Sequence, residues 1–170
     1  MANEFPWIVE PIRSRHDRES FDCGELSLDE YLKKYARQNE DLNLSRTWVA
    51  RLPDDLRVVG YFSLSAGQIN AADLPPEDAK RLPCYPVPVV LVGRLAVDRS
   101  AQGRRLGYGL LVRSLERAYQ VSKEIGVYAV AVVALSEAAR GFYLKCGFKE
   151  LKDDRMHLFL SVKTLRKLFE

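Results

Sequence analysis

The residues with the clearest chemical potential lie in one turn in the middle of the chain, residues 98–109. This segment carries three glycines and three arginines. An apolar run precedes it and a helical pattern follows, so unpaired backbone N–H groups and the positive end of a helix dipole meet there. Such a helix start binds anions, and glycine lets a phosphate approach the backbone closely. The turn therefore predicts a site for a phosphorylated ligand, although the glycines could equally serve tight packing of helix on sheet.

The spacing of these glycines excludes two common nucleotide-binding motifs. A P-loop ends in Gly-Lys followed by Ser or Thr, and the chain has no such segment. A dinucleotide-binding fingerprint places G-x-G-x-x-G on the first strand–helix turn, with an acidic residue about 20 positions later. Here the glycines stand mid-chain at positions 103, 107 and 109. A phosphorylated ligand must therefore be held by a loop of another kind.

Three elements position this turn. Residues 88–97 form an apolar run broken only by a Gly-Arg pair, and residues 127–134 form a second apolar run. Runs this apolar are typical of strands in the middle of a sheet. Between them the pattern predicts a helix over 103–122, so the three elements form a right-handed strand–helix–strand crossover. The expected buried side of the helix consists of Leu106, Leu110, Leu111, Leu115, Ala118 and Tyr119.

The rest of the pattern predicts smaller elements around this crossover. A capping box at Ser27 and Glu30 predicts the start of a helix whose apolar face is Leu28, Tyr31, Leu32, Tyr35 and Ala36. Ser136 caps a later helix, and Gly147 ends it. Strands are expected at 7–12, 46–51, 58–65 and 156–162, a hairpin turn at 53–55, a long connection at 74–88 and a final helical turn at 165–169.

Composition indicates one globular domain spanning 1–170, since 47% of the residues are hydrophobic and the net charge is only +3. No stretch is apolar enough to span a membrane, and no secretory leader is visible, so a cytoplasmic location is expected. The cysteines lack metal-site or redox spacing, so no metal is expected. Basic residues that form either a solvated surface or an anion-binding face are Arg94, Arg99, Arg104, Arg105, Arg113, Arg117, Lys163, Arg166 and Lys167.

Two motifs in the last 85 or so residues resemble those of GNAT acetyltransferases. The segment Arg104–Gly109 resembles the R/Q-x-x-G-x-G/A pyrophosphate loop of that family, and Ala139–Phe148 resembles its A-x-x-F-Y-x-x-x-G-F helix. Both occur in the family's order, which makes the resemblance specific. It implies the α/β (α+β) GNAT fold, in which helices flank a mixed, mostly antiparallel sheet around a βαβ acetyl-CoA-binding core.

The resemblance also implies roles for individual residues, with acetyl-CoA as the acetyl donor. Tyr143 matches the family's general acid, which protonates the departing CoA thiolate. The backbone of Leu95, Ala96 and Val97 would align the pantetheine arm. The residues expected to bind the pyrophosphate are Gln102, Gly103, Arg104, Arg105, Leu106, Gly107, Tyr108 and Gly109.

A general base is missing from the position where many GNAT enzymes carry one, because residues 87–97 contain no carboxylate. Neutralising a lysine of pKa 10.4 at pH 7 costs roughly 4.6 kcal/mol, whereas an α-amine of pKa 7.7 costs about 1 kcal/mol. In an aminoacyl ester the amine is more acidic still, so water could accept its proton. The missing base therefore favours an α-amine substrate over lysine.

A narrower resemblance covers nearly the whole chain. Its segments are similar to those of GNAT toxins from bacterial toxin–antitoxin pairs: His16-Asp17, Phe21-Asp22-Cys23-Gly24, Leu28, Tyr31-Leu32, Gln38-Asn39, Ser45-Arg46-Thr47, Val59–Leu64 and Gly93–Asp98. It implies an enzyme that acetylates the α-amine of aminoacyl-tRNA and blocks translation. It also implies a homodimer that is inhibited by a ribbon-helix-helix antitoxin.

Two alternatives to this function remain open. The first is a GNAT enzyme acting on a small amine or on protein N-termini, and the second is a catalytically silent module that binds CoA or a partner. His16, His157, Trp48 and Tyr61 are given no catalytic role, because such residues are more often structural.

Overall fold

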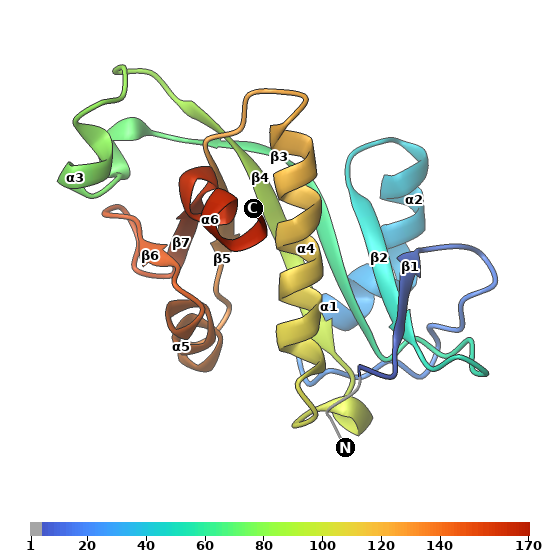
Figure 1. Cartoon of the computed structure of the whole chain (residues 1–170). Coiled ribbons are helices and arrows are strands. Elements are labelled where there is room, and N and C mark those ends of the chain that lie inside the picture. The colour runs from blue at the N-terminus through green and yellow to red at the C-terminus, as the bar shows by residue number, and fades with distance from the viewer. Residues whose placement is uncertain (1–4) are drawn as a thin grey trace. The chain divides into compact units, whose positions relative to one another are not determined.

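The computed structural model describes residues 5–170, which fall into two compact units. The first unit comprises the chain up to Ser65 together with Gly93–Ser114, and the second comprises Ala66–Val92 together with Leu115–Glu170. Two strands, β3 (Gly60–Ile69) and β4 (Val87–Val97), and the longest helix, α4 (Leu106–Ser122), each contribute residues to both units. Figure 1 shows the elements coloured by residue number. Each unit is described by itself below.

Seven strands are hydrogen-bonded in the order β1-β2-β3-β4-β5-β7-β6. β4 and β5 pair in parallel, whereas the pairs β1–β2, β2–β3, β5–β7 and β6–β7 are antiparallel. The mixed, mostly antiparallel sheet and the β2–β3 hairpin are therefore confirmed. The strands are β1 Ile8–Pro11, β2 Arg46–Arg51, β3 Gly60–Ile69, β4 Val87–Val97, β5 Ala129–Val133, β6 Lys149–Glu150 and β7 His157–Ser161.

Most helices lie where the sequence predicts them, with changes at their ends. Ser136 caps α5 by accepting a hydrogen bond from the Ala139 N–H, and Gly147 follows with a φ of +95°, as predicted. The final helix has two turns instead of one. The helices are α1 Leu26–Glu30, η1 Tyr31–Tyr35, α2 Ala36–Asp41, η2 Ala71–Asp73, α3 Pro76–Ala79, η3 Arg99–Ala101, α4 Leu106–Ser122, α5 Glu137–Lys145 and α6 Val162–Phe169.

The first predicted helix differs most from expectation. The capping box is wrong, because the helix begins at Leu26 and Glu25 precedes it without a side-chain cap. Its middle section is a π-helix, η1, and the Arg18 guanidinium donates to the Leu32 carbonyl at 2.8 Å. A π-helix bonds residue i to i+5, which rotates the following side chains away from the α-helical register. Tyr35, the last residue of η1, is 49% exposed rather than buried, whereas Ala36 is buried as predicted.

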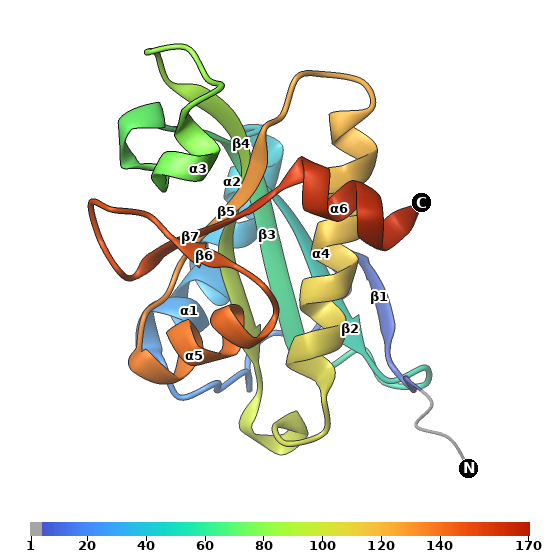
Figure 2. The ribbon, with the colours of Figure 1, turned by 60° about the vertical axis from the view of Figure 1, so that its left-hand side comes forward.

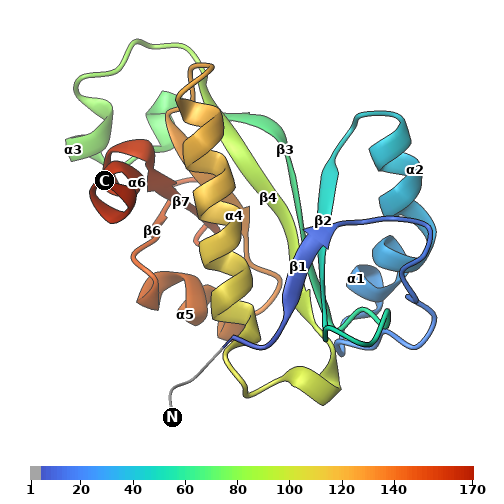
Figure 3. The same ribbon diagram turned by 45° about the vertical axis from the view of Figure 1, so that its right-hand side comes forward.

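A core cluster of the first unit contains three aromatic rings among aliphatic side chains. The Tyr61 ring packs edge-on against Phe21 at 5.7 Å and is stacked with Tyr31 at 6.3 Å. The Tyr61 hydroxyl donates to the Leu28 carbonyl at 2.7 Å. Figure 3 shows α1 and α2 beside β2. Tyr61 is therefore a core residue whose hydrogen bond links α1 to the sheet.

One core cluster of the second unit consists of buried aliphatic side chains around the Phe159 ring. Leu74, Ala129, Ala131 and Phe159 are each at most 5% exposed and belong to one cluster. In Figure 2, α5 and α6 lie toward opposite ends of β7. β7 thus lies between α5, the helix that contains the family-like tyrosine motif, and the C-terminal helix α6.

Helix α4 begins at Leu106, not at Gly103 as predicted. Gly103 has a φ of +77° and Arg105 a φ of +67°, and neither conformation belongs in a right-handed helix. All six side chains predicted for the buried side of the helix are at most 4% exposed. Within residues 5–170, none of the helices is both long and apolar enough to cross a membrane.

Candidate active site

Asp98 fixes the end of β4, where the candidate site begins. Its carboxylate accepts hydrogen bonds from the Ser100 N–H at 3.0 Å, the Ser100 hydroxyl at 2.6 Å and the Asp22 N–H at 2.8 Å. Burial alone would raise the pKa of Asp98, but these hydrogen bonds outweigh it and lower the pKa. Asp98 was assigned no individual role from the sequence, although its position directly after an apolar run could have indicated that it fixes the end of the strand.

Gln102 opens the segment that we call the arginine loop, residues 102–109. Its side-chain amide donates to the Val97 carbonyl at 2.9 Å and to the Cys23 carbonyl at 3.1 Å. Both amide protons are therefore used within the protein. This arrangement ties the loop to the end of β4 and leaves only the backbone and the side-chain oxygen of Gln102 for a ligand.

The backbone of the arginine loop is left-handed at two positions. Gly103 adopts its φ of +77° freely, but Arg105 carries a side chain at a φ of +67°. The left-handed conformation costs a non-glycine residue about 1–2 kcal/mol. Strain of this kind clusters at ligand sites, and backbone N–H groups in such turns form concavities that bind anions. The loop geometry thus supports the predicted phosphate site.

Positions 107 and 109 are occupied by glycine for different reasons. A Cβ on Gly107 would lie 3.7 Å from Val97 Cγ2, an ordinary contact, so packing among the described residues does not require glycine there. A Cβ on Gly109 would lie 2.2 Å from Phe5 Cε2, which is impossible without movement. Packing therefore accounts for Gly109, whereas close approach of a ligand remains the better interpretation of Gly107.

The arginine loop borders a cavity of about 730 Å³. The rings of Phe5, Trp7 and Tyr108 line it, and so do Arg104, Arg105 and Arg113. Among residues 5–170, no carboxylate forms an ion pair with any of these three arginines. The cavity is therefore suited to an anion with an aromatic or apolar part. Sequence reasoning missed Phe5 and Trp7, since nothing local connects them with residues almost a hundred positions later.

Four other residues predicted to contact the cofactor have side chains that pack within the protein. Ala96 is buried, and Leu95 and Val97 are half-buried, so their side chains serve the core of β4. The Leu106 side chain is 1% exposed and packs near Gly60. Only the backbone atoms of these residues remain for a ligand, as the expected pantetheine alignment requires.

Tyr143 lies on α5 in the second unit and is 7% exposed. Its ring packs against Phe142 at 5.3 Å and Phe148 at 5.4 Å. Burial, with a smaller contribution from the nearby Cys146, raises the pKa of Tyr143 to about 12. No hydrogen bond engages its hydroxyl in the part of the chain that the structure describes. Tyr143 therefore presents a protonated, uncommitted donor at neutral pH.

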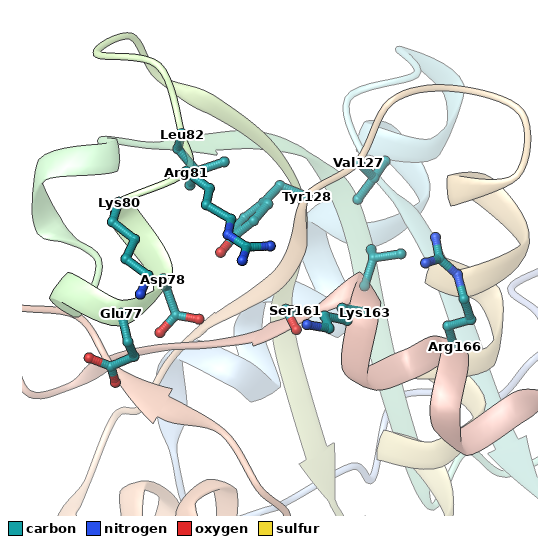
Figure 4. A pocket seen from close by; sticks show the side chains of 11 residues that line it. Glu77, Asp78, Lys80, Arg81, Leu82, Val127, Tyr128, Ser161, Lys163 and Arg166 are labelled. Carbon is teal, nitrogen blue, oxygen red and sulfur yellow. The ribbon is translucent and has the colours of Figure 1, made fainter.

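A second cavity, of about 590 Å³, lies in the second unit and is shown in Figure 4. Arg81 reaches into it from the connection after α3, and Lys163 and Arg166 project from α6. Lys80 also lines it, so four cations face two carboxylates, Glu77 and Asp78. Asp78 forms an ion pair at 3.1 Å with Lys149, which lies outside the lining. We call this the basic cavity. It joins Lys163 and Arg166, two of the basic residues considered for an anion-binding face, with Lys80 and Arg81, which were not singled out from the sequence.

Other basic residues considered for an anion-binding face have partners within the protein. The Arg94 guanidinium lies 3.6 Å from the centroid of the Tyr31 ring, and Arg99 forms a 3.1 Å ion pair with Asp22. His16 is buried, with its Nε2 2.6 Å from a Glu10 carboxylate oxygen. His16 is thus structural, as expected. Within the described residues, no cluster of side chains could hold a metal ion.

Comparisons with known proteins place these features in context. A family model described as "Acetyltransferase (GNAT) domain" matches residues 43–150. A curated relative from Mycobacterium tuberculosis, described as "tRNA-acetylating toxin", is 42% identical over 157 residues, covering 92% of this chain and 93% of the relative.

Two solved structures of AtaT are also similar. One, complexed with acetyl-methionyl-tRNAfMet, has a TM-score of 0.90 and 28% identity, and the match covers 96% of this chain and 99% of that chain. The other is a tyrosine-to-phenylalanine variant bound to acetyl-CoA and to the C-terminus of the antitoxin AtaR. It has a TM-score of 0.83 and 25% identity, over 96% of this chain and 98% of that chain.

Proposed function

The chain belongs to the GNAT family of acetyltransferases, and from this premise we propose that it acetylates the α-amine of aminoacyl-tRNA and so blocks translation as a toxin. It is an acetyl-CoA-dependent N-acetyltransferase. The observation that carries the substrate assignment is the near full-length identity to a tRNA-acetylating toxin. Within the described residues, the Tyr143 hydroxyl has no hydrogen-bond partner and Arg104 and Arg105 have no carboxylate partner. Such an enzyme needs both features, and they argue against a catalytically silent module.

The arginine loop binds the pyrophosphate of acetyl-CoA. The backbone N–H groups at the start of α4 and the guanidinium groups of Arg104 and Arg105 supply positive charge, with which no carboxylate of residues 5–170 forms an ion pair. Gly107 leaves room for a phosphate against the helix. The backbone of Leu95–Val97 aligns the pantetheine arm, and Gln102 holds the loop against the end of that strand.

Tyr143 acts as the general acid toward the CoA sulfur. Because the pKa of Tyr143 is raised to about 12, its hydroxyl is always available as a donor near neutral pH. A free thiol has a pKa near 8.5, below that of Tyr143. The Tyr143 hydroxyl therefore hydrogen-bonds to the sulfur as the carbon–sulfur bond breaks and donates its proton to the departing thiolate, and solvent then reprotonates the tyrosinate.

The acceptor amine loses its proton to water. No carboxylate lies on β4 to act as a base. The attacking amine forms the new C–N bond, the thioester C–S bond breaks, and CoA leaves as the thiol. An α-amine of low pKa suits this chemistry better than lysine does.

The expected partners follow from the same family relationship. The basic cavity contacts phosphates of the tRNA, and a ribbon-helix-helix antitoxin inhibits the enzyme. The active form is a homodimer in the cytoplasm, with both units of the chain acting as a single acetyltransferase domain.

Two assays test this function. Purified enzyme with labelled acetyl-CoA should acetylate aminoacyl-tRNA and leave peptides and polyamines unmodified. Induced expression without the antitoxin should arrest bacterial growth while acetylated aminoacyl-tRNA accumulates. Normal growth at good expression, together with acetylation of polyamines or peptides, would instead support an enzyme for small amines or protein N-termini.

A further inference from the structure

Two aromatic residues that precede the first strand lie directly against the arginine loop. Phe5 packs so closely on α4 that a Cβ at Gly109 would be 2.2 Å from its Cε2 atom. The Phe5 and Trp7 rings contact each other edge to face, with centroids 5.1 Å apart and planes at 72°. Trp7 is only 7% exposed. We call this pair the aromatic clamp.

An arginine guanidinium group lies over each ring of the aromatic clamp. The Arg104 guanidinium carbon lies 5.5 Å from the centroid of the Trp7 ring, and that of Arg113 lies 5.1 Å from the centroid of Phe5. Both distances are within the range of cation–π attraction. This attraction restricts where the guanidinium group lies but leaves its full positive charge for a ligand. An ion pair with a carboxylate would have cancelled that charge.

We propose that Phe5 and Trp7 are positioning residues for acetyl-CoA: they hold Arg104 and Arg113 over the cavity beside the arginine loop, where these cations meet the phosphates of the nucleotide end. The proposal rests on the proposed function for its ligand. It makes affinity for the acetyl donor depend on a segment remote in sequence from the loop, while leaving the chemical step untouched.

The first test separates donor binding from chemistry with Trp7→Ala in the full chain. At saturating aminoacyl-tRNA, the KM for acetyl-CoA should rise about fivefold, as expected for the loss of one cation–π contact of about 1 kcal/mol. The kcat should stay within about twofold, because Tyr143 and its surroundings are unchanged. Trp7→Phe keeps a ring under Arg104 and should restore most of the affinity.

Trp48→Phe is the matched control for loss of an indole elsewhere. Trp48 is stacked with Phe62 at 5.2 Å in the sheet of the first unit. This substitution should change the thermal midpoint without changing the KM for acetyl-CoA. If Trp7→Ala lowers kcat and leaves KM unaltered, or if Trp7→Phe is no better than Trp7→Ala, the positioning role is excluded. Should Trp7→Ala fail to fold, Trp7→Leu and Trp7→Phe decide the same question.

A double-mutant cycle tests the contact between Phe5 and Gly109 independently of catalysis. Gly109→Ala alone should lower the thermal midpoint, because Phe5 must move. Phe5→Ala removes the obstructing ring, so the double variant should lose clearly less than the sum of the two single losses. Additive losses would show that the clamp does not pack on α4 as the structure places it, and would overturn the proposal.

Failure of the proposed function is distinguishable from failure of the clamp. If the unsubstituted enzyme neither binds acetyl-CoA nor transfers acetyl, the function and the ligand of the clamp are both wrong. If it does both, but Trp7→Ala and Phe5→Ala bind acetyl-CoA as tightly as the unsubstituted enzyme in calorimetry, only the clamp is wrong. A weakened affinity in both variants, recovered in Trp7→Phe, supports the clamp.

Discussion

The arginine loop in the first unit and the Tyr143 environment in the second unit are built on opposite principles. The loop is exposed, cationic and strained, and its binding capacity comes from backbone conformation and charge. Tyr143 is buried, neutral and surrounded by apolar rings, and its capacity comes from one hydroxyl group. Substitutions in the loop should therefore change affinity by degrees, whereas loss of a single oxygen atom at Tyr143 should change the rate abruptly.

The largest expected effect is that of Tyr143→Phe. This substitution keeps the ring and its packing and removes only the proton donor. Turnover should fall by at least about a hundredfold, the lower end of the range for positioned proton transfer, and growth arrest on induction should disappear. Acetyl-CoA affinity and the thermal midpoint should stay close to those of the unsubstituted enzyme.

The control for this experiment is Tyr119→Phe, a second buried tyrosine of the same unit whose hydroxyl is hydrogen-bonded to Glu170. It should cost some stability and leave turnover unchanged. If single-turnover rates of Tyr143→Phe remain within a few-fold of the unsubstituted rate, water or another donor protonates the thiolate, and the contrast between the two regions disappears.

The second prediction concerns the loop itself. Gly107→Glu places a carboxylate and extra volume where the pyrophosphate is expected, so calorimetry on the folded variant should show acetyl-CoA affinity reduced by about a hundredfold or more, since a like charge replaces an attractive contact. Gly126→Glu introduces the same side chain at an open position of the second unit, where a Cβ would meet nothing within 4 Å, and should leave affinity unchanged. Retained affinity in Gly107→Glu would remove this glycine from the site.

The two regions also differ in how far sequence predicts them. The α5 motif is local, since its cap, its stop and Tyr143 lie within twelve residues, and all three were predicted. The loop residues were predicted as a set, but the start of α4 was not, because a left-handed arginine has no strong sequence signature. The aromatic clamp was missed because its contact with Gly109 joins positions 5 and 109.

Smaller errors have equally local physical causes. The two-residue strand β6 is too short to show an alternating pattern. The apparent capping box at Ser27 fits the consensus, yet α1 starts at Leu26 without a side-chain cap, and the Tyr61 hydroxyl donates to the Leu28 carbonyl in its first turn. Sequence patterns thus identified the elements that position the site, while the contacts between distant segments required the structure.

A third prediction extends the comparison to RNA. Reversing the charges of Lys163 and Arg166 to glutamate should weaken tRNA binding about tenfold or more and reduce its dependence on salt, because fewer counterions are released from the phosphates. Acetyl-CoA affinity should not change, since neither residue lines the cavity at the arginine loop. Lys152→Glu, an exposed charge reversal outside the basic cavity, is the matched control. Equal loss in the control would mean that only net charge matters.

The smallest expected effect, and the one that best separates the function of the loop from its stability, is that of Arg105→Gly. Arg105 has a φ of +67°, so glycine should relieve a strain of about 1–2 kcal/mol, offset by about 0.5–1 kcal/mol from the greater freedom of the unfolded chain. The thermal midpoint should rise slightly, by about 2–4 °C per 1 kcal/mol gained. Acetyl-CoA affinity should fall about fivefold, as expected for loss of one exposed charged contact of about 1 kcal/mol.

Two control variants make this trade-off specific. Arg105→Lys keeps both the charge and the left-handed conformation, so neither quantity should change much. Asn43→Gly relieves the other left-handed non-glycine residue of the described chain, at a φ of +57° in the turn after α2, and should leave acetyl-CoA affinity alone. A stabilised Arg105→Gly with reduced affinity would show that the strained backbone is retained for binding. If instead stability and affinity fall together, the Arg105 side chain supports the loop structurally, and the loop and Tyr143 regions are less different than the structure indicates.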